Sequence, residues 1–127
     1  MSRFSEKLDT LFRTAELIAN ADLGVLAEAL RQGRHRPAVA IGSGGSAITA
    51  HYFARCRETL FEAATQVVTP AEFVLSNDDL AQSDVWLFSA GADNADSTAS
   101  VVAARARGAA RIHLLTRNAE GLAARAV

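Results

Sequence analysis

The chain has 127 residues, half of them hydrophobic, and its formal net charge is −1. That length fits one domain with a full core, and a balanced charge without basic and aromatic residues interleaved argues against a nucleic-acid partner. The single cysteine, Cys56, excludes an internal disulfide and a multi-cysteine zinc site, and we expect no metal and no cofactor. Because we find neither a signal peptide nor a membrane span, we expect a cytoplasmic protein without a membrane partner.

Apolar residues recur at every third or fourth position from Phe4 to Leu30, which predicts helix. Asn20, Asp22 and Gly24 interrupt the pattern, so we expect two helices or one kinked helix. We predict an N-terminal helical segment over residues 1–35 and a separate domain over 36–127. The apolar stripe of the first helix leaves two interpretations open, packing on its own sheet or on a second subunit.

Short apolar runs alternate with helical patterns through the rest of the chain. The predicted strands are 37–41, 66–69, 84–88 and 111–115, and the predicted helices are 47–64, 70–75, 95–107 and 119–127. This alternation predicts right-handed crossovers and a doubly wound parallel sheet, a three-layer α/β/α fold preceded by the N-terminal helices. Open sheets of this kind often have a fifth strand, so we expect a domain truncated at its C-terminus, with a natural four-strand domain as the alternative.

A glycine and serine loop, residues 42–46, connects the first strand to a helix. Its glycines allow close backbone approach, the helix N-terminus attracts anions, and Ser43 and Ser46 offer hydroxyl donors, so a phosphate is the expected ligand. A dinucleotide site would need an acid where Thr69 and Pro70 follow the second strand, and a Walker loop would need a lysine that is missing here. A turn that only connects strand and helix remains the third alternative.

Hydroxyl side chains also follow the third and fourth strands, at Ser89 and Thr116. Because the carboxyl ends of parallel strands meet at one edge of the sheet, we expect the loops after strands one, three and four to form one crevice. Taken singly, each polar residue could serve only to cap a helix, with Asn94 or Asp93 as the expected N-cap of the helix after the third strand.

In order and spacing these segments resemble the sugar isomerase (SIS) family of phosphosugar-binding domains. The similar segments, all after Arg36, are Ala40–Ser46, Ser83–Asp84, Phe88–Gly91, 106–109 and Leu115–Asn118. The resemblance implies a flavodoxin-like fold, a sugar phosphate as ligand, and a homodimer or second SIS module as partner. Carried over to this chain, the expected phosphosugar-binding residues are Ser43, Gly44, Gly45, Ser46, Ser89, Gly91, Asn94 and Thr116.

The loop after the third strand departs from the family's usual Ser-x-Ser-Gly-x-Thr. This chain reads Ser-Ala-Gly-Ala-Asp-Asn from Ser89 to Asn94, so two hydroxyl donors are lost. The Asn94 amide and backbone N–H groups could substitute for them. Asp93 brings a negative charge that weakens phosphate binding unless it points away or caps the helix.

An isomerase would need a base to move a proton between adjacent sugar carbons. Glu72 and His51 are the catalytic candidates, with Glu58 as a solvated third. The resemblance implies that the isomerase glutamate comes from beyond the covered stretch or from a second subunit or module. Three functions therefore stay open, which are a sugar-phosphate isomerase, a non-catalytic sensor or structural half of a tandem protein, and a nucleotide-binding Rossmann module.

Overall fold

The computed structural model describes residues 3–127, which divide into two compact units at Gln32 and Gly33. The first unit contains α1 (Arg3–Ala19) and α2 (Gly24–Gln32). Between them the Gly24 amide donates to Asp22 Oδ1 at 2.9 Å, a local bond that competes with helical bonding and separates the two helices. Apolar side chains of α1 are exposed, Phe4 by 70% and Phe12 by 71%. Within residues 3–127, none of the helices is both long enough and apolar enough to cross a bilayer.

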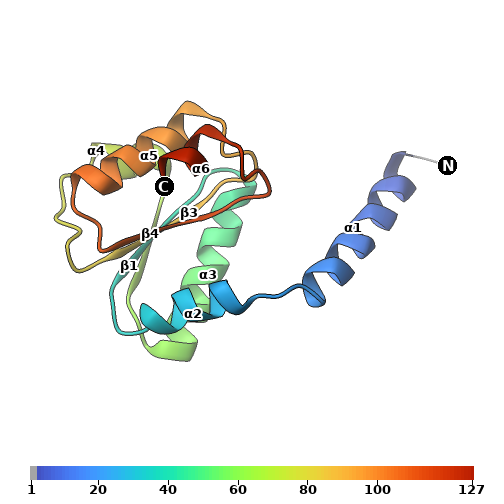
Figure 1. Cartoon of the computed structure of the whole chain (residues 1–127), viewed down its shortest axis with the longest axis horizontal. Helices are drawn as coiled ribbons and strands as arrows, with labels where there is room; N and C mark the ends of the chain where they lie inside the picture. Colours follow the sequence, from blue (N-terminus) through green and yellow to red (C-terminus); the bar gives the residue numbers. More distant parts are fainter. Residues whose placement is uncertain (1–2) are drawn as a thin grey trace. The chain divides into compact units, whose positions relative to one another are not determined.

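The second unit contains a four-stranded parallel sheet in the order β2-β1-β3-β4. Its strands are β1 (Ala38–Ile41), β2 (Thr65–Val68), β3 (Asp84–Phe88) and β4 (Arg111–Leu115). One face is covered by α3 (Gly45–Phe61), and the other by α4 (Pro70–Leu75), α5 (Ala95–Ala106) and α6 (Leu122–Ala126), as Figure 1 shows. These three layers confirm the predicted doubly wound α/β fold.

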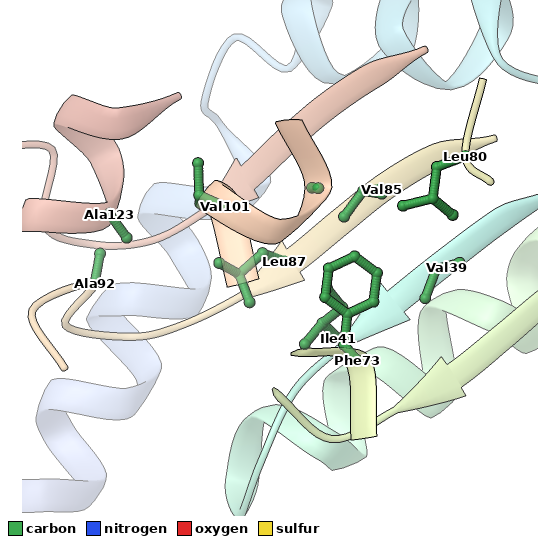
Figure 2. Close-up of a cluster of buried hydrophobic side chains, with 10 residues drawn as sticks. Val39, Ile41, Phe73, Leu80, Val85, Leu87, Ala92, Val101 and Ala123 are labelled. Carbon is green, nitrogen blue, oxygen red and sulfur yellow. The ribbon is translucent and has the colours of Figure 1, made fainter. Parts of the chain in front are cut away.

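The two central strands are buried along their whole length because helices cover both faces of the sheet. Alternate residues enter different cores. The core beneath α5 is shown in Figure 2, and its buried members are Val39, Ile41, Phe73, Leu80, Val85, Leu87, Ala92, Val101, Ala104 and Ala123. On the α3 face, the ring centroid of Phe53 lies 4.7 Å from that of Trp86 and 5.2 Å from that of Phe88.

Local signals in the sequence mark the helix ends. Pro70 opens α4, and Asn94 caps α5 by accepting a hydrogen bond from the Ser97 amide at 2.7 Å, as predicted. Gly108, just after α5, has a φ of +71°, which glycine adopts at low cost. The last helix is shorter than the predicted 119–127, because the Gly121 amide closes a turn onto the Asn118 carbonyl before α6 begins.

Candidate functional site

The ends of β1, β3 and β4 lie next to one another at the carboxyl edge of the sheet. In register, Ile41 pairs with Leu87 and Phe88 pairs with Leu115, so the loops that follow these strands are neighbours. A cleft of about 330 Å³ opens between them. Its lining residues are Ser46, Thr49, Phe88, Ser89, Ala90, Leu115, Thr116 and Arg117.

The loop after β1 depends on glycine at two positions. A Cβ on Gly42 would lie 2.5 Å from the Ser46 carbonyl oxygen, so only glycine lets the start of α3 turn back over the strand. Gly44, the N-cap of α3, has a φ of +56° and offers no side chain, which leaves the first amides of the helix without a side-chain cap. Ser46 lines the cleft from the first turn, and Thr49 lines it three residues later on the same helix face.

Ser89 shapes the second loop and faces the cleft as well. Its side chain is buried, and its Oγ accepts hydrogen bonds from the Ala92 amide at 3.1 Å and from Ser97 Oγ at 3.0 Å. Since both of these bonds use Ser89 as the acceptor, its own hydroxyl hydrogen is left for a further acceptor. Ser89 can therefore hold the loop and donate to a ligand at the same time.

The third loop, after β4, is bonded to the second. Thr116 Oγ1 donates to the Ala90 carbonyl at 3.1 Å, and the Arg117 amide donates to the same oxygen at 3.3 Å. Asn118 Nδ2 donates to the Gly91 carbonyl and to Asp93 Oδ2, each at 2.9 Å. The two loops therefore form one bonded wall of the cleft.

Asp93 is held toward the start of α6. Besides the Asn118 amide, it accepts the Leu122 backbone N–H at 3.3 Å through Oδ1. Both carboxylate oxygens are thus used by the third loop, and Asp93 is not among the residues lining the cleft. The condition that the sequence set for this acid, that it point away or act as a cap, describes its position here.

The structure brings three of the predicted binding residues together, Ser46, Ser89 and Thr116. The other five surround the cleft without lining it. Ser43, Gly44 and Gly45 form the turn into α3, Gly91 accepts from Asn118 through its carbonyl, and Asn94 caps α5. Sequence reasoning missed Thr49 and Arg117. The spacing of Thr49 from Ser46 on a helix could have revealed the first, whereas nothing local distinguished Arg117 from the other arginines.

The structure does not bring the catalytic candidates to the cleft. Glu72 closes a capping box, accepting the Thr69 amide at 2.7 Å and the Thr69 hydroxyl at 3.1 Å, and these two bonds, the amide's first, lower the pKa of Glu72. It lines a different cleft, formed by residues of β2 and α4. His51 is exposed on α3, and Glu58 pairs with Arg55 at 3.2 Å. Among the described residues that line the cleft, none carries a carboxylate or an imidazole.

A buried polar layer lies under α3, toward the other end of the strands. Arg57 donates to the carbonyls of Gly33 and Arg36, at 2.9 and 2.8 Å, and to Thr65 Oγ1 at 2.8 Å. Burial lowers the pKa of Arg57, and the nearby Asp84 carboxylate partly opposes that change. Because Asp84 opens β3 at the amino end, this layer stabilises the fold away from the cleft. Within residues 3–127, no three His, Cys, Asp or Glu side chains cluster as metal ligands would.

Solved structures show the same arrangement, although no family model and no curated protein sequence matches this chain. A Silicibacter pomeroyi DSS-3 protein provisionally assigned as a phosphosugar isomerase is 19% identical with a TM-score of 0.73, and the match covers 88% of this chain and 35% of that one. An Escherichia coli CFT073 protein solved in complex with a phosphosugar is 21% identical with a TM-score of 0.72, covering 99% and 71%.

A third similar structure is the sugar isomerase domain of the RpiR transcription factor from Sphaerobacter thermophilus, at 19% identity and a TM-score of 0.68, covering 98% of this chain and 69% of that one. The chain thus spans about a third of the Silicibacter protein and about 70% of the other two. All three agree in fold with the parallel sheet and layers described above. This chain has the fold of a sugar isomerase (SIS) domain.

Proposed function

We propose that the cleft binds the phosphate group of a sugar phosphate. The observation that carries this proposal is the convergence of four hydroxyl side chains from three chain segments, Ser46 and Thr49 on α3, Ser89 after β3 and Thr116 after β4. Hydroxyls and the free amides of a helix N-terminus donate to the acceptor oxygens of phosphate. The similar structures support a sugar phosphate in particular, because one was solved with a phosphosugar and another is a sugar isomerase domain.

In this proposal the lining hydroxyls contact the phosphate directly. Backbone N–H groups of Gly44 and Gly45 and the Ser43 hydroxyl complete the first wall, since they precede the open end of α3. Gly91 and Asn94 act through the loop that they shape. We assign binding to residues 36–127 and treat residues 1–35 as an N-terminal helical segment.

Binding without catalysis is favoured by the chemistry of the lining. Moving a proton between sugar carbons requires a base within hydrogen-bond reach, and the lining residues within the described part of the chain include no carboxylate or imidazole. For an isomerase, the base would have to come from a homodimer partner or a second SIS module, and we propose such a partner for this chain. A sugar phosphate as ligand also favours the cytoplasm as the compartment.

Calorimetric titration tests the proposal. We expect saturable binding of pentose and hexose phosphates, such as arabinose 5-phosphate and fructose 6-phosphate, and none of the unphosphorylated sugars. Thr49→Ala should weaken binding roughly 10-fold, since a hydrogen bond to a charged group contributes about 1.5–3 kcal/mol. Thr59→Ala, an exposed threonine on the same helix, is the matched control and should bind like the wild type.

Other outcomes separate the alternatives. Binding of NAD or ATP in place of sugar phosphates would show a nucleotide-binding module. Binding of no probe would indicate a structural half of a larger protein and would overturn the proposal. Interconversion of an aldose and a ketose phosphate, followed by NMR, would show that the chain itself catalyses.

A further inference from the structure

We propose that Arg117 supplies the positive charge that selects a doubly charged phosphate in the cleft. This inference rests on the proposed function, because it concerns the same cleft. Among the described residues that line it, Arg117 is the one with an ionisable side chain, and the others are hydroxyl-bearing or apolar. The lining therefore has a net positive charge at neutral pH, contributed by a single side chain.

The position of Arg117 is set by its backbone. It directly follows Thr116 at the end of β4, and its amide donates to the Ala90 carbonyl at 3.3 Å. That bond, together with the bond from Thr116 Oγ1 to the same oxygen, attaches the arginine to the wall that includes Ser89. Arg117 thus belongs to a fixed turn beside the predicted phosphate donors and not to a free chain end.

The guanidinium is available for a ligand. Within the described residues 3–127, ion pairs join other arginines to acids, and none involves Arg117. The acid of the facing loop, Asp93, is occupied by the Asn118 amide and the Leu122 backbone N–H. A charged group beside a cleft without an ion-pair partner in the protein gains most from an anionic ligand.

The chemistry of the cleft requires such a charge. A phosphate monoester has a charge of about −1.5 to −2 at pH 7, whereas the hydroxyls of Ser46, Thr49, Ser89 and Thr116 are neutral donors. In the loop after β3, only Ser89 directs a hydroxyl to the cleft, because Asn94 caps α5. A guanidinium adds charge and a planar pair of N–H donors that match two phosphate oxygens.

The test compares Arg117→Gln with Arg55→Gln, which removes an exposed arginine on α3 and changes the net charge equally. Calorimetry with fructose 6-phosphate and with inorganic phosphate should show affinity about 10- to 100-fold lower for Arg117→Gln, partial recovery for Arg117→Lys, and wild-type affinity for Arg55→Gln. The melting temperature without ligand should equal that of the wild type, so a loss of binding cannot come from unfolding.

The outcomes distinguish this inference from the proposed function. If the wild type binds fructose 6-phosphate and Arg117→Gln binds it equally well, the role of Arg117 is wrong and the proposed function stands. If inorganic phosphate binds through Arg117 but no sugar phosphate binds better than phosphate alone, the role of Arg117 stands and the sugar function is wrong. If the wild type binds neither probe, both are overturned.

Discussion

Asn118 Nδ2 donates a hydrogen bond to Asp93 Oδ2 at 2.9 Å and so holds an acid of one loop against the turn of another. The same amide group reaches the Gly91 carbonyl at 2.9 Å. These two bonds join the loops after β3 and β4 and direct a negative charge away from the side where Ser89 and Arg117 line the cleft. The relationship gives a direct test of whether loop geometry controls anion binding.

We predict that Asn118→Ala lowers the free energy of unfolding by about 1–3 kcal/mol, because a carbonyl and a carboxylate lose their donor. It should also weaken phosphate binding, since Asp93 is then free to bring its charge toward the cleft. Denaturant unfolding and calorimetry measure the two effects. The double variant Asp93→Asn/Asn118→Ala should regain affinity but not stability, and affinity that stays low in it would contradict this explanation.

Gly42→Ala should destabilise the unit by about 1–3 kcal/mol, since overpacking against backbone cannot be relieved by a side-chain movement. The added Cβ would lie 2.5 Å from the Ser46 carbonyl oxygen. Gly45→Ala is the matched control in the same loop, because a Cβ there meets nothing within 4 Å. Thermal unfolding should separate the two variants, and equal melting temperatures would show that the start of α3 can shift to make room.

Arg57→Met should cost roughly 3–5 kcal/mol, because removing one member of a buried charged group leaves its partners uncompensated. Three acceptors lose their donor, the Gly33 and Arg36 carbonyls and Thr65 Oγ1, and the buried Asp84 loses a nearby cation. Urea unfolding measures the loss. Arg55→Met, two residues away on the solvent side with a side chain 81% exposed, should change stability by no more than about 0.5 kcal/mol.

His113 predicts an acid-sensitive stability. Its ring stacks on Trp86 with centroids 4.0 Å apart, and burial lowers its pKa below the ordinary 6.5, an effect that Asp84 opposes and Arg111 reinforces. Because the unfolded chain takes up the proton more readily than the folded one, this residue contributes nothing above pH 6.5 and destabilises the fold increasingly below it, down to the folded pKa.

The variant His113→Phe keeps an aromatic ring over Trp86 and removes the titrating group. Its free energy of unfolding should fall less steeply than that of the wild type as the pH drops below 6.5. Chemical unfolding at several pH values between about 5 and 7.5 gives the comparison. Parallel slopes for the two proteins would mean that other groups cause the acid sensitivity.

Features that depend on neighbours in the chain could be determined from the sequence. Gly42 and Gly44 marked the turn into α3, Pro70 marked the start of α4, and Asn94 was one of two expected caps of α5. Backbone conformation and helix ends are set by one residue and its next few neighbours, so residue type is enough to indicate them. The alternation of strands and helices likewise implied the parallel sheet, because crossovers follow a fixed hand.

Only the tertiary structure decided which side chains share the cleft. The strand order places β3 beside β4 and leaves β2 at the far edge, so Arg117 lines the cleft while Glu72 lines another. The direction of Asp93 was equally undetermined, since its partners Asn118 and Leu122 lie 25 and 29 residues away. Contacts over such separations depend on how whole elements pack, and the local pattern around a residue does not carry that information.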